Sequence, residues 1–394
     1  MLGHLKPTVT LASEKTSLIR LHTGCRGILR RDFTACKASA ACTTPLGTSS
    51  LEVSKICFGT MLFGTSTDCY TTTNLLATAV EGGVNFFDTA EMYPVPQSAT
   101  TQGRSEEILG DWLLHQRRED IVVATKVAGP SAQMEWIRSG PQSLNAQNIT
   151  EAIDGSLKRL RSDYIDLVQI HWPDRYVPMF GETSYRSSQD YSAVPLEEQL
   201  MAIGKAVAAG KVAAVGLSNE TPWGLMHCCH LAQVTQHLPK VASIQNAYSL
   251  VCRNFEEGLA ECCHRENVSL LAYSPLAMGL LTGKYLAEDG GPPEARLNRY
   301  KGRYAEAESR YGPRPNLLKA VRAYVSLAQE AGMSPIELAI RFVLSQELMA
   351  SVIVGATTPA QLLEIMSSTQ KGPLDSSILK AIDGIHESYP NPAP

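Results

Sequence analysis

The sequence predicts a single (β/α)8 barrel, the TIM barrel of the α/β class, over most of its 394 residues. Short apolar segments alternate with segments of helical periodicity, which indicates parallel strands joined by helices. Eight such units in roughly 300 residues match the usual length of a closed barrel. An open dinucleotide-binding sheet would carry a GxGxxG fingerprint after its first strand. The sequence has GTMLFG at 59–64 instead, so we favour the barrel.

A second glycine-rich segment, GLLTGKY at 279–285, does not match a phosphate-binding P-loop. Its spacing is too short, and Tyr285 stands where a serine or threonine would bind magnesium. This segment therefore gives no support to the P-loop class of nucleotide-binding folds.

The expected strands are apolar runs that end at a polar residue. In VNFFD at 84–88 the apolar residues leave no polar face, so both faces of this strand must be buried. Gly82 and Gly83 separate it from the helix before it. The eight strands are expected at 53–59, 84–88, 121–126, 164–171, 212–217, 242–245, 268–273 and 351–354.

The expected helices fill the intervals between these strands. Asn148 is expected to cap the third helix, with Glu151 three residues later completing a capping box. Gly82 and Gly210 follow the last periodic residues of two other helices, a common place for glycine. The helices are expected at 70–81, 105–116, 148–160, 195–209, 222–233, 255–266, 317–331 and 335–344, with a last one starting near Pro359.

The composition, with 44% hydrophobic and 19% charged residues and a net charge of −4, is that of a globular protein. A mildly acidic chain lacks the electrostatic footprint of a nucleic-acid-binding protein. No uninterrupted apolar run approaches the ~20 residues that a membrane helix needs. We therefore expect neither a nucleic-acid nor a membrane partner, and a small molecule as the substrate.

The ten cysteines predict neither disulfides nor a metal site. Cys228-Cys229 and Cys262-Cys263 are neighbours within helical patterns, and Cys57 lies in an expected strand. No CxxC pair or His/Cys cluster has metal-ligand spacing. The cysteines are interpreted as reduced thiols of an intracellular enzyme.

Residues 1–42 differ from the rest of the chain. They carry seven basic residues against only Glu14 and Asp32, with many Ser, Thr and Ala. This composition is typical of an organelle transit peptide, although a basic tail without a targeting role has the same composition. The run ASAAC at 38–42 favours a chloroplast, with a mitochondrion or the cytoplasm as the alternatives. We therefore expect a transit peptide at 1–42 and one barrel domain at 43–394.

In a closed parallel barrel, the residues at the C-terminal ends of the strands converge on one mouth, where active sites lie. The expected strand ends are Asp88, Lys126, His171, Asn219, Gln245, Tyr273 and Gly355, and Tyr93 follows the first of them. Each residue alone also fits a structural role, such as an Asp–Lys ion pair at the barrel rim or a hydrogen-bonded core histidine. An aspartate, a tyrosine, a lysine and a histidine on successive units together favour a catalytic site.

These residue types suit proton donation to a carbonyl oxygen. A tyrosine is a poor acid at neutral pH, with a pKa of about 10, and a neighbouring ammonium stabilises its phenolate. Lys126 is therefore expected to lower the pKa of Tyr93, while Asp88 keeps Lys126 charged and in position. His171 is expected to orient or polarise the bound carbonyl. Together they would supply the proton that a carbonyl reduction needs besides its hydride.

Several motifs resemble the aldo-keto reductase superfamily, and the similarity runs from about Leu51 to the C-terminus. The motifs occur in family order and at family spacing: GGVNFFDTA at 82–90, ATK at 124–126, QIHW at 169–172, GLSN at 216–219 and IVGA at 353–356. Three further segments are similar to the Tas-type NADP(H)-dependent branch: AEMYPVP at 90–96, SNET at 218–221 and SYP at 388–390. The resemblance implies a (β/α)8 barrel that binds NADP(H) in extended form without a Rossmann domain.

The resemblance also implies roles for the residues at the barrel mouth. The catalytic tetrad would be Asp88, Tyr93, Lys126 and His171, with Tyr93 as the general acid. The nicotinamide carboxamide would be held by Ser218, Asn219 and Gln245, and Tyr273 would line the nicotinamide side of the cleft.

The rest of the cofactor would follow the loops after the last two strands. The residues implied along its phosphates are Ser274, Leu276, Gly279 and Lys284. Those implied at its adenosine end are Gly355, Thr357, Gln361 and Glu364. Gln361 and Glu364 fit an exposed helix face equally well.

One position departs from the family pattern. Many aldo-keto reductases bind the 2′-phosphate with an arginine after the eighth strand, where this sequence has Gln361. Members that resemble the potassium-channel β-subunits share a glutamine there and bind NADP(H). We therefore expect NADPH rather than NADH as the cofactor.

Two segments are too long for ordinary connections. Residues 172–194, which include four aromatic residues, are interpreted as a substrate lid or else as a partly disordered insertion: Tyr176, Phe180, Tyr185 and Tyr191. Residues 286–315 are expected to fold over the cofactor phosphates unless they form only a solvated charge run, and their basic residues are Arg296, Arg299, Lys301, Arg303 and Arg310.

The leading functional hypothesis is the NADPH-dependent reduction of aldehydes or ketones to alcohols, together with the reverse oxidation. The alternative is an NADP(H)-binding redox-sensing regulatory subunit with little turnover, like the potassium-channel β-subunits. The complete tetrad favours the enzyme. A lyase or isomerase would need phosphate-site or metal residues that we do not find in the sequence. A monomer and a homo-oligomer are both compatible with it.

Overall fold

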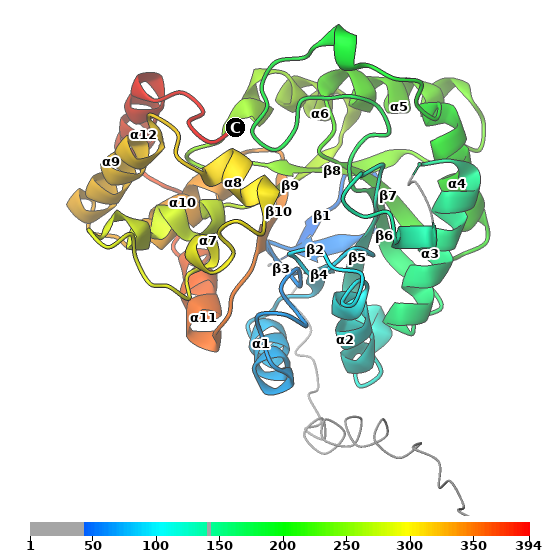
Figure 1. Ribbon diagram of the computed structural model, residues 1–394, viewed down its shortest axis with the longest axis horizontal. Coiled ribbons are helices and arrows are strands. Elements are labelled where there is room, and N and C mark those ends of the chain that lie inside the picture. Colours follow the sequence, from blue (N-terminus) through cyan, green and yellow to red (C-terminus); the bar gives the residue numbers. More distant parts are fainter. Residues whose placement is uncertain (1–42, 140–142) are drawn as a thin grey trace, which may run out of the picture.

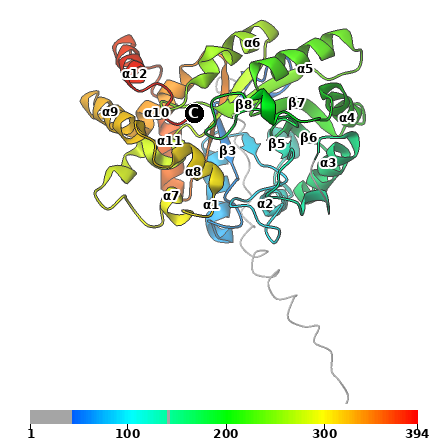
Figure 2. The same ribbon diagram turned by 45° about the horizontal axis from the view of Figure 1, so that its top comes forward.

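A computed structural model describes residues 43–139 and 143–394. Eight parallel strands close a barrel in the order β10-β3-β4-β5-β6-β7-β8-β9, and helices surround it (Figures 1 and 2). The predicted (β/α)8 barrel is therefore confirmed. The barrel strands are β3 (Ile56–Gly59), β4 (Phe86–Asp88), β5 (Val122–Val127), β6 (Ile165–Ile170), β7 (Val212–Ser218), β8 (Val241–Ala247), β9 (Ser269–Tyr273) and β10 (Met349–Val354). The predicted transit peptide at 1–42 lies outside the described residues.

Most helices begin and end within a few residues of the predicted positions. The predicted helix at 255–266 is divided at Gly258 into a 3₁₀ turn (Asn254–Glu257) and α6. Three helices were not predicted, namely α7, α8 and α12. In chain order the helices are α1 (Cys69–Glu81), α2 (Arg104–Leu113), α3 (Ala146–Leu160), α4 (Leu196–Ala208), α5 (Pro222–Val234), α6 (Leu259–Glu266), α7 (Arg296–Arg299), α8 (Ala305–Tyr311), α9 (Leu317–Glu330), α10 (Pro335–Leu344), α11 (Pro359–Ser368) and α12 (Ser376–Ser388). None of the helices in the described part of the chain is long and apolar enough to cross a membrane.

The prediction of a single strand at 53–59 is wrong. The chain bends at the exposed Lys55, which separates β2 (Glu52–Ser54) from the barrel strand β3. β2 pairs antiparallel with β1 (Thr43–Pro45) in a hairpin outside the barrel sheet. Val53 of this hairpin is fully buried and belongs to the apolar cluster inside the barrel. The hairpin therefore covers one end of the barrel and leaves the other end for the site.

The predicted cap of the third helix is also displaced. Asn145, and not Asn148, is the N-cap of α3, because its side chain accepts a hydrogen bond from the Asn148 backbone N–H at 2.9 Å. Asn148 instead accepts a hydrogen bond from the Arg138 guanidinium at 3.0 Å. The sequence pattern identified a helix start correctly but assigned the wrong asparagine to it.

Strand β4 shows how the barrel positions a polar side chain at its mouth. Phe86 points into the barrel, and Phe87 packs between the barrel and α2, with its ring 5.0 Å from that of Trp112. Each buried phenylalanine contributes about 1.5–3 kcal/mol to the stability of the fold. Side chains alternate along a strand, so Asp88 points inward as Phe86 does. The strand is therefore anchored on both faces, as predicted, and its last residue is presented at the mouth.

Candidate active site

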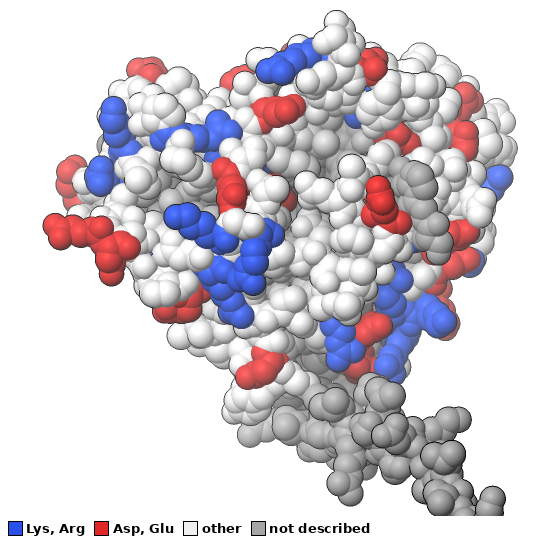
Figure 3. Space-filling view, viewed as in Figure 1, with Lys and Arg blue, Asp and Glu red and all other residues white. Residues whose placement is uncertain are grey.

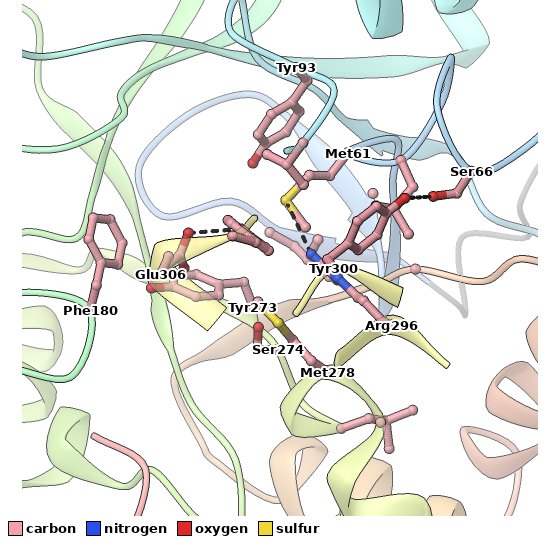
Figure 4. A pocket seen from close by; sticks show the side chains of 18 of the residues that line it. Met61, Ser66, Tyr93, Phe180, Tyr273, Ser274, Met278, Arg296, Tyr300 and Glu306 are labelled. Atoms are coloured by element: carbon pink, nitrogen blue, oxygen red, sulfur yellow. Dashed lines mark hydrogen bonds between the residues drawn. The ribbon is translucent and has the colours of Figure 1, made fainter. Parts of the chain in front are cut away.

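A cavity of about 840 Å³ lies at the C-terminal mouth of the barrel. It is lined by strand ends, by parts of the 172–194 segment and by α7 and α8 with their flanking residues. Figure 4 shows Tyr93 facing this cavity opposite side chains of the α7–α8 region. The mouth is where active sites of this fold are built.

Three of the predicted tetrad residues line the cavity, and the fourth lies directly behind them. Asp88, Tyr93 and His171 are at the cavity wall, whereas Lys126 is only 1% exposed. The Lys126 ammonium donates to Asp88 Oδ2 at 2.5 Å and to the Thr89 carbonyl at 2.8 Å. It lies 3.4 Å from the Tyr93 hydroxyl. The structure therefore brings the four residues together as one cluster.

The predicted lowering of the Tyr93 pKa is wrong for this structure. Burial raises the pKa of Tyr93 well above its usual value, and the Asp88 carboxylate raises it further. The buried phenol loses the water that would stabilise a phenolate, and this loss outweighs the opposing charge of Arg296. Tyr93 is therefore fully protonated at neutral pH, as a proton donor must be.

His171 is held as a neutral imidazole. Burial lowers its pKa well below the usual value, and the positive charge of Lys126 lowers it further. Its ring lies edge-on to that of Tyr93, with the centroids 5.6 Å apart. Its Nδ1 is buried and has no hydrogen-bond partner among the described residues. Both rings face the same part of the cavity, so a polar atom placed there can contact them together.

Two glutamines complete the surroundings of Asp88. Gln245 donates to Asp88 Oδ1 at 2.8 Å, and Gln169 approaches the same oxygen at 3.4 Å. Gln245 was expected at the cofactor, whereas the structure shows it bound to the tetrad aspartate. Gln169 was not predicted as a site residue, although a fully buried polar residue in an apolar strand indicates a required partner. The aspartate is therefore fixed by an ammonium and two amides.

A second hydrogen-bond chain lies at the ends of β7 and β9. Asn219 has a left-handed backbone (φ 52°) and donates from its amide to the His171 carbonyl at 2.9 Å. Its Oδ1 accepts from the Tyr273 hydroxyl at 2.6 Å. Ser218 donates to the Gln245 carbonyl at 2.9 Å. The cavity that Tyr93 faces is also lined, as predicted, by Ser218, Asn219, Gln245 and Tyr273.

The loop after β9 forms a cationic wall of the cavity. Ser274, Leu276, Gly279 and Lys284 all line it. Gly279 has φ +94°, and a Cβ there would lie 2.8 Å from Lys284 Cε, so the glycine makes room for the lysine stem. No described carboxylate lies within ion-pairing distance of Lys284, and burial lowers the pKa of this lysine. The Glu294 carboxylate opposes this lowering without forming an ion pair, so the half-buried ammonium is suited to an anionic ligand.

Residues after β10 form the far end of the cavity. Gly355, Thr357 and Gln361 line it, and the Gln361 side chain accepts from the Thr357 backbone N–H at 3.0 Å. Glu364 is exposed on α11 and is absent from the cavity lining. The structure therefore brings eleven of the twelve predicted cofactor residues to the cavity, and the role of Glu364 stays a prediction.

The two long segments both contribute walls to the cavity. Met179, Phe180 and Glu182 come from the 172–194 segment, while Tyr185 and Tyr191 are exposed. The 286–315 segment contributes the residues around α7 and α8, where basic side chains gather on the surface (Figure 3). Arg296 reaches into the cavity, and its buried Nε has no partner among the described residues (Figure 4). The arginine-rich segment is thus partly folded over the cavity.

Sequence reasoning missed the clamp that holds the loop with Tyr93. Glu91 is 2% exposed, forms an ion pair with Arg138 and accepts the Ala128 backbone N–H at 2.7 Å. Arg138 also donates to the Ala128 carbonyl at 3.0 Å. The loop that carries Tyr93 is therefore fastened to the end of β5. The signal available in the sequence was a carboxylate between Asp88 and Tyr93.

The donor set of the cavity fits a nicotinamide dinucleotide. It offers side-chain amides near the tetrad, an aromatic face at Tyr273 and the cations of Lys284 and Arg296. Amides suit a carboxamide, and cations suit phosphates. No group of three or more His, Cys, Asp or Glu side chains is arranged to hold a metal ion among residues 43–139 and 143–394.

Comparisons with known proteins identify the family. The family model described as "Aldo/keto reductase family" matches residues 55–387. Protein tas of Escherichia coli is 42% identical over 347 residues, which cover 88% of this chain and 98% of that protein. A probable voltage-gated potassium channel subunit beta of Oryza sativa is 32% identical over 356 residues, which cover 88% of this chain and 96% of that protein. An uncharacterized oxidoreductase, YrpG of Bacillus subtilis, is 30% identical over 355 residues, covering 89% and 96%. The chain therefore belongs to the aldo/keto reductase family of oxidoreductases.

Proposed function

We propose that this protein reduces aldehydes or ketones to alcohols with NADPH, and that Tyr93 is the proton donor. The observation that carries the proposal is the position of the Tyr93 hydroxyl. It lies at the cavity wall, 3.4 Å from a buried ammonium that is itself ion-paired with Asp88. A phenol beside a fixed cation suits an oxygen that gains negative charge as it is reduced.

The proton chemistry follows from the charges of the cluster. Tyr93 begins protonated because burial raises its pKa. As the carbonyl oxygen becomes an alkoxide it takes the Tyr93 proton, and the ammonium of Lys126 offsets the charge of the phenolate left behind. Neutral His171 has one ring N–H with which to orient the carbonyl, and its lowered pKa keeps it from acting as the acid.

The bound cofactor supplies the hydride. Asn219, Gln245 and Ser218 would hold its carboxamide, and Tyr273 would face the ring. Lys284 and Arg296 would meet its phosphates, and Thr357 and Gln361 its adenosine end. The support for this assignment is the presence of amide, aromatic and cationic groups in the lining of one cavity.

Turnover by the full chain tests the proposal. Absorbance would follow NADPH consumption with a panel of small aldehydes, ketones and quinones, and NADH would be run in parallel. We expect turnover of at least one carbonyl class and a lower KM for NADPH than for NADH. Failure to bind either cofactor would show that the proposal is wrong.

The second candidate function is a redox-sensing regulatory subunit that binds NADP(H) with little turnover. It is favoured by the similarity to a relative named as a probable potassium channel subunit beta. The same assay separates the two functions. Tight NADPH binding without turnover of any carbonyl would favour the sensor.

We further propose that residues 1–42 direct the protein to a chloroplast, on the basis of their basic, Ser- and Ala-rich composition. These residues, fused to a fluorescent reporter in leaf cells, should bring the reporter into chloroplasts. A reporter that stays in the cytoplasm or enters mitochondria would contradict this.

A further inference from the structure

Arg310 is a buried cation behind the wall of the cavity. It lies on α8 and is only 4% exposed. No described carboxylate approaches it within 4.0 Å, and its Nε and Nη1 have no hydrogen-bond partner among the described residues. Its guanidinium lies over the rings of Tyr273 and Phe180, 5.4 and 5.7 Å from their centroids. Burying a charge in this way is costly, so a role for Arg310 must be sought in what it contacts.

The contact of Arg310 with Tyr273 gives a directed hydrogen-bond chain. Arg310 Nη2 donates to the Tyr273 hydroxyl at 3.1 Å. An arginine has no acceptor, so the Tyr273 proton is available for Asn219 Oδ1, at 2.6 Å. The Asn219 amide nitrogen is thereby directed to the His171 carbonyl and the Ser218 hydroxyl. Arg310 therefore positions Asn219 through Tyr273.

The charge of Arg310 is also the stronger of two charges acting at Tyr273. Burial raises the pKa of Tyr273. The Arg310 charge lowers this pKa, and the Glu306 carboxylate raises it by a smaller amount than Arg310 lowers it. Glu306 lies at the cavity wall and accepts from the Tyr304 hydroxyl at 2.9 Å (Figure 4). Since an arginine stays protonated at all working pH values, the positive charge of Arg310 behind Tyr273 is permanent.

We propose that Arg310 is a positioning residue that makes the site bind the reduced cofactor more tightly than the oxidised one. This inference rests on the proposed function, in which Tyr273 faces the nicotinamide. The reduced nicotinamide ring is neutral, whereas the oxidised ring carries a positive charge. A fixed cation behind the ring therefore weakens binding of the oxidised form, which favours NADPH uptake before the reaction and NADP⁺ release after it.

The ratio of two dissociation constants tests the proposal. Quenching of tryptophan fluorescence would give the Kd of NADPH and of NADP⁺ for the full-length wild type, Arg310→Met and Arg310→Lys. By Coulomb's law, a unit charge on the far side of Tyr273 from the nicotinamide ring changes the ratio of the two Kd values by about ten-fold. We expect Arg310→Met to lower the NADP⁺-to-NADPH Kd ratio by about that factor. Arg310→Lys, which keeps the charge, should retain most of the ratio.

The controls separate charge from structure. Arg314→Met removes a neighbouring arginine that binds the Gly181 carbonyl at 2.8 Å, and it should leave the ratio unchanged. Glu306→Gln removes the opposing charge and should raise the ratio, which keeps the test decisive even if Arg310→Met does not fold. The inference about Arg310, but not the proposed function, would be overturned by either of two results. One is that Arg310→Met weakens the binding of NADPH and NADP⁺ equally, and the other is that Glu306→Gln leaves the Kd ratio unchanged. A wild type that binds neither cofactor would overturn the proposed function and this inference with it.

Discussion

Two of the carboxylate–cation pairs of the described residues look alike and differ in what surrounds them. Asp88 and Lys126 lie at the mouth, 2.5 Å apart, and the ammonium also faces the Tyr93 hydroxyl beside the cavity. Glu106 and Arg159 link α2 to α3 at 2.6 Å. The second oxygen of Glu106 accepts from Thr125 Oγ1 at 2.5 Å. Both carboxylates use both of their oxygens within the protein, but only the first pair borders a weak acid and the cavity, since neither Glu106 nor Arg159 lines it.

The difference shows that a buried ion pair alone does not mark a catalytic site. Both carboxylates are buried, and removing the cation of either pair leaves a buried negative charge. What distinguishes Asp88–Lys126 is the third group, a phenol whose burial holds it protonated at the edge of a cavity.

Lys126→Met should damage both catalysis and stability. The phenolate of Tyr93 would lose its counter-charge, so kcat/KM for a carbonyl substrate should fall by roughly 100-fold or more. Asp88 would be left unpaired, which costs about 3–5 kcal/mol of unfolding free energy. Steady-state rates and urea unfolding measure the two effects. Activity within a few-fold of wild type would assign the pair a purely structural role.

Glu106→Gln should damage stability alone. The neutral amide keeps the shape of the side chain but leaves Arg159 without its carboxylate, and we expect a loss of about 3 kcal/mol in unfolding free energy. The kcat/KM of the folded variant should equal that of wild type. If instead activity fell as far as in Lys126→Met, the comparison between the two pairs would fail.

Glu91→Gln should give an intermediate result. The clamp to Arg138 and Ala128 would weaken, and the loop that carries Tyr93 would be less well placed. We expect kcat to fall by about ten-fold with NADPH binding unchanged, since small misplacements of a reacting group are costly. A fall in NADPH affinity instead of kcat would show that the clamp serves the cofactor site.

The pH dependence of the unfolding free energy should show that His171 is neutral in the folded protein. Its pKa is lowered well below the usual 6.5 in the folded protein. The unfolded chain therefore binds a proton as pH falls through about 6.5 while the folded protein does not, so stability decreases there. The urea unfolding free energy of wild type should fall relative to that of His171→Gln as pH drops below about 6.5, and the two should run parallel above it. Identical pH slopes for the two proteins would contradict a neutral His171.

Much of the site could be predicted because it depends on strand ends. Asp88, Lys126 and Asn219 each follow a short apolar run, and parallel strands bring such residues to one mouth. Tyr93 could be predicted to lie near Lys126 because it follows the end of β4 by only a short loop. The geometry of the cluster thus follows from strand order and chain direction.

Other features depend on burial, which local patterns do not reveal. The bend at Lys55 lies between two apolar runs, so the hairpin strand and the barrel strand were read as one. The Tyr93 pKa was predicted from its neighbour alone, without the larger effect of burial. Arg310 was grouped with the basic residues expected over the cofactor phosphates, whereas the fold buries it against Tyr273. Each of these three outcomes is decided by tertiary contacts.

The most direct test of the central claim is hydride transfer in a single turnover by Tyr93→Phe. The protein would be saturated with NADPH, mixed with a carbonyl that wild type reduces, and followed by loss of NADPH absorbance. We predict unchanged NADPH affinity and a rate lower by at least about 100-fold, because only the proton donor is removed. A rate close to that of wild type would show that Tyr93 does not donate the proton, and the role assigned to the Asp88–Lys126 pair would be contradicted with it.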